Sequence, residues 1–378
     1  MPETHPVPAL PERLLLGPGP SNVPERVRRA QGAPMIGHLD PAFLAVLEEA
    51  KAALAELFGT RNRFTLPLSA TGSAGMEACL VNLLEPGDRV VVGVHGVFGS
   101  RMCEVARRAG ADVTAVEAPF GQALDPDAMR EAIRAIKPRA VAFVHAETST
   151  GVLQPVEEIA AAACDADALV ILDCVTSLGG VSVALDEWGI DAAYSGTQKC
   201  LSCPPGLSPV SFSERALERV RARSHPVQSW YLDVTLLDGY YATGKRVYHH
   251  TAPISAILGL AEGLRIVLEE GLDARAQRHR EAAGRLIAEL EPLGFEPLVA
   301  EALRLPPLTT LRLPRAVTSR GEADVRARLL LHHGIEVGGG LGPLAGSIWR
   351  VGLMGENARI ECVEQLALAL EDELERLH

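Results

Sequence analysis

Leu169-Val-Ile-Leu-Asp173 is a short apolar run that ends in a carboxylate, and a second run at residues 192–194 leads into Ser195-Gly-Thr-Gln-Lys199. Short runs that are apolar throughout are typical of strands covered on both faces by helices. Open sheets of such strands bind ligands at the carboxyl ends of the strands. We therefore expect Asp173 and Lys199 to lie at one ligand-binding edge of a mainly parallel sheet.

Short apolar runs alternate with helical stretches over the first two thirds of the chain, which is typical of a parallel sheet covered by helices. One helix is expected over residues 39–59, because Asp40 suits the N-cap, Pro41 suits the first helical position and Gly59 suits the C-terminal end. The expected strands are Val90–Val94, Val113–Val116, Ala140–His145, Leu169–Cys174, Ala192–Ser195 and Pro209–Phe212. Helices are expected between them, for example at Asp127–Ile136 and Val156–Ala163.

The pattern changes after about residue 252. Two long helical stretches, Pro253–Glu270 and Asp273–Leu290, precede shorter strands at Thr309–Leu313 and Ile348–Val351. The chain has 378 residues, and single cores stop growing at roughly 250 to 300 residues. We expect an α/β fold with a large domain over residues 21–252 and a smaller α+β domain over residues 253–378. Residues 1–20 are expected to form an arm on the smaller domain or on a partner subunit.

Composition excludes several classes of function. A formal net charge of −12 disfavours nucleic acid as a partner, because that partner requires clustered Lys and Arg. No apolar stretch approaches the roughly 20 residues of a membrane span, and the start of the chain lacks the basic and apolar segments of a secretory signal. Seven cysteines, an odd number in a long chain, indicate a reducing compartment. We expect a cytoplasmic protein with no membrane partner.

Three local sequences carry possible chemistry. Ser69-Ala-Thr-Gly-Ser-Ala-Gly75 lies before a helical pattern that starts at Met76, and the N–H groups at a helix start favour an anion such as phosphate. Asp173 could pair with a cationic ring nitrogen, although a helix N-cap or a metal ligand uses the same residue type. Lys199 could reach into the crevice at the sheet edge, but most lysines are solvated.

The whole set of motifs is more specific than any member. The sequences SATGSAG at 69–75, ETSTGVLQP at 147–155, LDCVTSLGG at 172–180, SGTQK at 195–199 and RVYHHT at 246–251 resemble class V aminotransferases, and most of all the alanine–glyoxylate and serine–pyruvate branch. The resemblance runs from Gly17-Pro-Gly-Pro-Ser-Asn22 to Arg350-Val-Gly-Leu353. It implies the fold type I of aspartate-aminotransferase-like enzymes, with pyridoxal 5'-phosphate (PLP) as cofactor.

The resemblance also implies roles for single residues. Lys199 would form the Schiff base with the cofactor and move the substrate proton, while Asp173 would pair with the pyridine nitrogen. Phe98 corresponds to a ring stacked on the pyridine, although a core phenylalanine is the alternative. The implied cofactor-binding residues are Thr71, Gly72, Ser73, Phe98, Thr148, Asp173, Val175, Gln198, Lys199, Tyr248 and Thr251. Arg350 and Gly37 are implied for the substrate, and no metal is expected.

Two of these sites lie outside the Asp173 and Lys199 region. Tyr248 and Thr251 match residues that reach the neighbouring subunit's cofactor, which implies a homodimer with shared active sites, although the adjacent histidines could also form a metal or surface cluster. The fork of Arg350 suits a substrate carboxylate, with a structural ion pair as the alternative. Gly338-Gly-Gly-Leu-Gly342 precedes it and reads as a flexible loop that could close the site.

The sequence therefore predicts transfer of an amino group from alanine or serine to glyoxylate or pyruvate. Three alternatives stay open. The donor could be 2-aminoethylphosphonate or ureidoglycine, the protein could be a class V lyase or cysteine desulfurase, or it could be a non-catalytic scaffold. A desulfurase needs a cysteine on a mobile loop, and Cys200 and Cys203 lie too close to Lys199 to serve.

Overall fold

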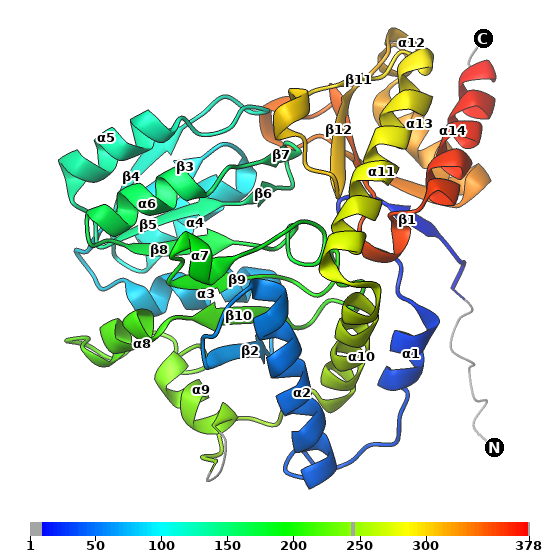
Figure 1. Ribbon diagram of the computed structural model, residues 1–378. Helices are drawn as coiled ribbons and strands as arrows, with labels where there is room; N and C mark the ends of the chain where they lie inside the picture. Colours follow the sequence, from blue (N-terminus) through cyan, green and yellow to red (C-terminus); the bar gives the residue numbers. More distant parts are fainter. Residues whose placement is uncertain (1–9, 243–245, 377–378) are drawn as a thin grey trace, which may run out of the picture.

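A seven-stranded sheet forms the centre of the larger part of the molecule (Figure 1). The computed structural model describes residues 10–242 and 246–376. All neighbouring strands run parallel except β10, which is antiparallel to both of its neighbours. The expected α/β fold with a mainly parallel sheet is thus confirmed. In sheet order the strands are β2 (Phe64–Leu68), β10 (Ser208–Phe212), β9 (Ala192–Tyr194), β8 (Leu169–Asp173), β5 (Ala140–Val144), β3 (Arg89–Val94) and β4 (Asp112–Glu117).

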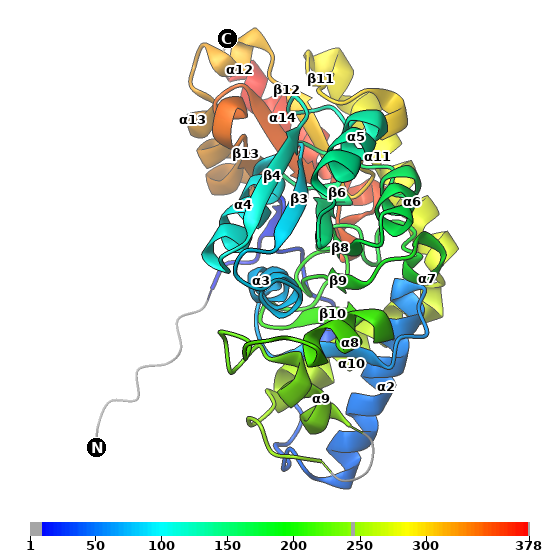
Figure 2. The ribbon, with the colours of Figure 1, turned by 90° about the vertical axis from the view of Figure 1, so that its left-hand side faces the viewer.

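Helices cover both faces of this sheet, and Figure 2 shows α3 and α4 on one face and α5, α6 and α7 on the other. This two-sided cover explains why β2, β5, β8, β9 and β10 are buried along their whole length. No helix in the described part of the chain is both long and apolar enough to span a bilayer. The helices up to this point are α1 (Glu25–Gln31), α2 (Pro41–Phe58), α3 (Gly72–Leu83), α4 (Val97–Arg108), α5 (Pro126–Ile136), α6 (Glu157–Asp165), α7 (Leu185–Trp188), α8 (Glu214–Arg221) and α9 (Val234–Tyr241).

Two features of this region differ from the sequence prediction. Strand β2 was not among the expected strands, because Pro67 lies inside it and proline lacks an N–H for the ladder. Helix α3 begins at Gly72 and not at Met76. The small residues of the SATGSAG sequence therefore form the first turn of the helix itself.

A second, five-stranded sheet lies beside the first and packs against the C-terminal helices (Figure 1). Strands β12 and β14 pair antiparallel, and α11 packs against α14 over a separate apolar cluster that includes Trp349 and Phe295. The strands in order are β1 (Leu14–Leu16), β13 (Ile335–Gly339), β14 (Ile348–Gly352), β12 (Leu308–Arg312) and β11 (Glu296–Pro297). The helices of this region are α10 (Ile254–Glu270), α11 (Leu272–Leu290), α12 (Arg315–Thr318), α13 (Glu322–Arg328) and α14 (Ile360–Glu375).

The N-terminal segment joins the two sheets. Strand β1 pairs parallel with β13, and Arg13 donates to the carbonyl of Leu330 across 317 residues of sequence. Directly after β1, the chain passes the first sheet, where the carbonyl of Pro18 accepts a hydrogen bond from Lys199. Helix α10 packs on α1 and α2, so its apolar side chains belong to the larger cluster.

A buried carboxylate, Glu373 of α14, anchors the C-terminal helix. It accepts from Arg328 Nε and from His332 Nδ1, each at 2.6 Å, and from His333 Nε2 at 3.2 Å. Burial alone would raise the pKa of Glu373, but the hydrogen bonds from His332 and Arg328 and the charge of Arg328 lower it to about 2. The folded state therefore favours the ionised carboxylate.

We expect Glu373→Gln to lower the free energy of unfolding at pH 7 by about 1 to 2 kcal/mol, because charge-assisted hydrogen bonds are lost while Arg328 and His332 stay partly solvated. A depressed carboxyl pKa stabilises the fold above the unfolded pKa of about 4.3 and loses this effect as the pH falls toward the folded value. The difference in thermal midpoint between variant and wild type should therefore shrink below about pH 4. Glu371→Gln, at an exposed position of the same helix, is the control. A difference that stays constant across this range would contradict the account.

Candidate active site

A cavity of about 190 Å³ lies at the carboxyl edge of the seven-stranded sheet, where β8 and β9 end. It brings together eight of the residues that the sequence predicts for the cofactor. A wider surface hollow of about 710 Å³, lined by α5 and α6, holds none of them. The residues that line the smaller cavity are Thr71, Gly72, Ser73, Met76, Phe98, Arg101, Asp173, Val175, Tyr194, Gln198 and Lys199.

Asp173 ends β8 and is 2% exposed. The Tyr194 hydroxyl donates to its Oδ2 at 2.7 Å and the Val175 N–H donates to its Oδ1 at 2.7 Å. Burial raises the pKa of Asp173 to about 7, although both hydrogen bonds oppose this shift. A cationic N–H group in the cavity would stabilise the ionised form of this carboxylate, as water does for an exposed one.

Lys199 follows β9 in the next loop and is also buried. Its amine donates to the Pro18 carbonyl. Burial lowers the pKa of Lys199 to about 8, and the charge of Arg350 acts in the same direction. The unprotonated amine, which is the nucleophilic and basic form, is therefore accessible near neutral pH.

The first turn of α3 forms one wall of the cavity through Thr71, Gly72 and Ser73. The first N–H groups of a helix have no acceptor within the helix, and Thr71 makes no capping hydrogen bond from its side chain. A Cβ at Gly72 would lie 3.3 Å from the Ser195 carbonyl oxygen, a tight contact, so glycine lets this turn approach the strand end without displacing it. Gln198 lines the same cavity, and its buried Oε1 has no hydrogen-bond partner.

Phe98 lies in the first turn of α4, half-buried at the cavity wall. The Arg101 guanidinium stands over its ring, with the carbon Cζ 4.9 Å from the ring centroid. One face of the ring is thus covered by a cation, and a flat ligand can stack on the other.

Arg350 in β14 lies on the side of the second sheet and is 7% exposed. It donates from Nε to the Gly339 carbonyl at 2.8 Å and from Nη1 to the Thr148 carbonyl at 3.3 Å. Burial lowers its pKa, and within residues 10–242 and 246–376 no carboxylate approaches it to ion-pair distance. Within these residues Arg350 makes no structural ion pair, and the guanidinium keeps donor capacity for an anion.

The glycine-rich sequence before Arg350 was expected to be a flexible loop, and this is partly wrong. Gly338 and Gly339 belong to β13 and pair with Arg350 and Trp349 of β14. A Cβ at Gly338 would lie 2.4 Å from Pro18 Cδ, so glycine is needed here for close packing. Sequence alone could not separate this requirement from flexibility.

Thr148 is not among the residues that line the cavity. It is buried, and its hydroxyl lies 2.6 Å from that of Thr176. Gly37, Tyr248 and Thr251 are exposed and line no part of the cavity within this chain. Tyr248 is 67% exposed, and its ring centroid lies 5.9 Å from that of His38, next to Gly37.

Several residues at the cavity carried no functional prediction from sequence. Tyr194 directly precedes the SGTQK sequence, and its pairing with Asp173 between β8 and β9 explains their hydrogen bond. Asp173 and Tyr194 each end one of two neighbouring strands, and this position could have predicted their contact from sequence. Met76 and Arg101 gave no such signal, because side chains on α3 and α4 reach the cavity only through the packing of those helices.

These groups fit the cofactor that the resemblance implies. The helix start and Gln198 suit a phosphate, Asp173 suits a protonated pyridine nitrogen, and Phe98 suits the ring face. Lys199 supplies an amine that can bond to the aldehyde carbon. Such a ligand would give the buried Gln198 oxygen a hydrogen-bond partner. It would also give Asp173, whose two hydrogen bonds come from neutral donors, a positively charged one.

Comparisons with known proteins agree with this chemistry. A family model described as Aminotransferase class-V matches residues 22–345. The alanine–glyoxylate aminotransferase of Oryctolagus cuniculus is 42% identical and spans 97% of this chain and 93% of that protein. The (S)-ureidoglycine–glyoxylate transaminase of Bacillus subtilis (strain 168) is 39% identical over 96% of this chain and 90% of that protein. A solved alanine–glyoxylate aminotransferase from Nostoc sp. is 47% identical, covers 98% of this chain and 97% of its own, and has a TM-score of 0.95.

Proposed function

Because the chain belongs to the class V aminotransferase family, whose members depend on PLP, we propose that it transfers an amino group from alanine or serine to glyoxylate or pyruvate. The observation that carries the proposal is one cavity bounded by Lys199, by the buried Asp173 and by the start of α3. All three proteins named above are glyoxylate enzymes, which favours glyoxylate as acceptor.

When bound, PLP draws electrons from the substrate carbon that loses its proton. In this proposal the Lys199 amine would hold the cofactor and, once released by the substrate, would carry the proton between the α-carbon of the substrate and the aldehyde carbon of the cofactor. Asp173 holds the positive charge at the ring nitrogen, with Tyr194 and Val175 fixing its orientation. Phe98 supports the ring, and the first turn of α3 with Gln198 binds the phosphate.

Arg350 binds the α-carboxylate, which alanine, serine, glyoxylate and pyruvate all share. Two parallel N–H donors on a planar guanidinium match the two oxygens of a carboxylate. The site is poorly accessible to water, which strengthens such a pair. Since donor and acceptor use the site in turn, a single arginine serves both halves of the reaction.

The alternatives differ in how well the structure supports them. Ureidoglycine stays a candidate donor because of the relative from Bacillus subtilis, and 2-aminoethylphosphonate would share the same cofactor residues. A desulfurase is disfavoured, since Cys200 and Cys203 are buried and burial raises the pKa of each thiol to about 12. A scaffold without catalysis would not need a buried lysine and aspartate at one cavity.

The proposal includes a cytoplasmic homodimer in which Tyr248 and Thr251 reach the partner's active site, and Gly37 is proposed to contact the substrate. Figure 1 shows the start of α2, the start of α10 and α9 at one end of the molecule, and large apolar side chains are exposed on the segments nearby. Exposed apolar side chains that gather at one end of a molecule favour a contact surface there. The exposed residues are Met35, Leu39, Trp230, Leu236, Val247 and Tyr248.

The division into an arm at residues 1–20, a large domain at 21–252 and a small domain at 253–378 is also part of this proposal. Two separate apolar clusters support two units. Helix α10, although after residue 252, packs with the first cluster.

A panel of amino donors against glyoxylate, pyruvate and 2-oxoglutarate tests the function. We expect protein mixed with PLP to be yellow, alanine to bleach it, and alanine with glyoxylate to give the highest kcat/KM. Lys199→Ala should keep PLP through its phosphate and ring contacts but abolish turnover, because the proton carrier is lost. Near wild-type transfer by this variant, or no transfer with any pair, would contradict the proposal.

Arg350→Ala should slow both half-reactions, by roughly thirtyfold to several thousandfold in kcat/KM, since loss of a buried charged partner costs about 2 to 5 kcal/mol. Arg350→Lys should recover only part of the loss, because the charge remains and the fork does not. The absorbance of the PLP-bound protein should be unchanged in both variants. Stopped-flow measurement of each half-reaction checks this, and an Arg350→Ala protein that is slow in neither half would show that the carboxylate binds elsewhere.

The dimer is tested through its coupling to PLP. If Tyr248 reaches the partner's phosphate, PLP should slow dissociation of the dimer, and Tyr248→Ala should raise the Kd for PLP about tenfold, because a hydrogen bond to a charged group is lost. Leu368→Ala, at a 66% exposed apolar position on α14, is the matched control. Analytical ultracentrifugation with and without PLP gives the assembly state, and a monomer that binds PLP as tightly as the dimer would rule out the shared site.

A further inference from the structure

Helix α4 begins without a capping side chain of its own, although it carries the ring at the cavity. Its N-cap residue is Gly96, and no side-chain hydrogen bond caps the helix locally. The first N–H groups of a helix need acceptors, and a buried helix end without them is costly. The acceptors at this end come from a different segment, the hairpin of β6 (Ala146–Glu147) and β7 (Val152–Leu153).

Two side chains of this hairpin cap α4. Glu147 Oε2 accepts from the Phe98 N–H at 3.2 Å, and Ser149 Oγ accepts from the Val97 N–H at 2.9 Å. Glu147 Oε1 accepts from the Ser149 hydroxyl at 2.5 Å and from the Ser149 N–H at 3.1 Å. The Gly99 N–H also donates to the Glu147 carboxylate.

The contact between hairpin and helix leaves no spare room. Glu147 is 0% exposed. A Cβ at Gly96 would lie 2.3 Å from both Cγ and Cδ of Glu147, so only a glycine at the N-cap lets the carboxylate reach the helix. Gly96, which has no side chain to cap the helix, therefore leaves room for the Glu147 carboxylate to do so.

The turn of the same hairpin also contacts Arg350, the residue proposed to bind the substrate carboxylate. The backbone carbonyl of Glu147 accepts from Thr150 N and Gly151 N, which closes the turn. Thr148 within the turn offers its carbonyl to Arg350 Nη1. Burial lowers the pKa of Arg350, and the negative charge of Glu147 opposes part of this shift.

We propose that Glu147 is a positioning residue that sets the start of α4, and with it Phe98, against the bound cofactor. This inference rests on the proposed function for the identity of the ligand. Glu147 is not among the residues that line the cavity, so it would act through Phe98 and through the turn that supports Arg350. Its carboxylate must be an acceptor at both oxygens, because every hydrogen bond given to it comes from an N–H or O–H donor.

Glu147→Gln keeps the shape but turns one acceptor into a donor. The donors to one carboxylate oxygen then face an NH₂ group and lose their acceptor. The start of α4 is therefore less ordered before PLP binds, and binding must also order it. We expect the Kd for PLP, from a tryptophan-fluorescence titration of the cofactor-free protein, to rise about tenfold to a hundredfold, the range for buried donors left unpaired. The visible circular dichroism of bound PLP should also fall, because the ring is held less firmly. Glu147→Asp, which keeps the charge, should recover part of both signals.

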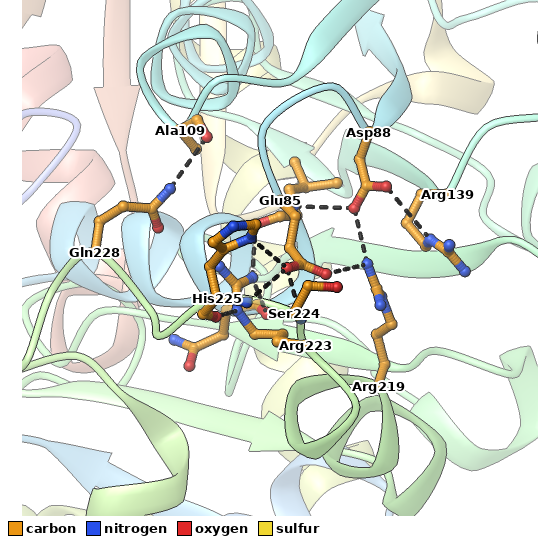
Figure 3. A network of polar contacts seen from close by, with 11 residues as sticks. Glu85, Asp88, Ala109, Arg139, Arg219, Arg223, Ser224, His225 and Gln228 are labelled. Atoms are coloured by element: carbon orange, nitrogen blue, oxygen red, sulfur yellow. Dashed lines mark hydrogen bonds and ion pairs between the residues drawn. The ribbon is translucent and has the colours of Figure 1, made fainter.

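Glu85 provides the matched control. It is also buried and accepts from the N–H groups of Ser224 and His225 and from Arg219, in a network whose labelled residues do not line the cavity (Figure 3). Glu85→Gln should lower the thermal midpoint but change the Kd for PLP less than twofold. Equal loss of PLP affinity in both variants would overturn the proposal, since destabilisation alone would then explain it.

Gly96→Ala tests the same contact with Glu147 intact. The added methyl displaces the carboxylate from the helix, so the Kd and the dichroism should change in the same direction as in Glu147→Gln. Folded Glu147→Gln or Gly96→Ala protein with wild-type PLP affinity and dichroism would overturn the proposal. Neither measurement uses a substrate, so the donor panel tests the proposed function separately.

Discussion

Asp173 is 2% exposed and accepts two hydrogen bonds from neutral donors, and the cost of burying this carboxylate is the constraint on which the site depends. A buried carboxylate needs a positive partner or it takes up a proton. Parallel strands bring their carboxyl ends to one edge of the sheet. That edge is where Tyr194 steadies Asp173 and where Lys199 lies on the next loop, so the fold itself creates the demand for a cationic ligand.

Burial in the cavity shifts the pKa values of its titratable groups, and two helices begin at its wall. Burial moves the pKa of Asp173 upward and that of Lys199 downward, so neither charge is held firmly in the absence of a ligand. The starts of α3 and α4 both lie at the cavity wall. The first is left open for an anion, whereas Glu147 and Ser149 fill the second. Two similar helix ends thus differ in function because only one of them has acceptors from the protein.

Sequence predicted the features that depend on local pattern. The strands that end at Asp173 and before Lys199 follow from apolar runs bounded by polar residues. It missed β2, because Pro67 disfavours a strand unless the partner strand is known, and it assigned Gly338 and Gly339 to a loop. It also gave no role to Glu147 or Pro18. Their contacts join segments that are distant in sequence, and no local pattern encodes such packing.

The N-terminal strand has a consequence for synthesis of the chain. Among residues 10–242 and 246–376, strand β1 pairs with β13 alone, and Arg13 contacts Leu330 across 317 residues. The seven-stranded sheet ends at residue 212, so it can form on the ribosome while β1 still lacks its partner. Domains fold as they emerge, and long-range pairing comes last. The segment around β1 is therefore ordered later than the seven-stranded sheet that follows it in sequence, and Pro18 reaches its place beside the amine of Lys199 only after β13 has been made.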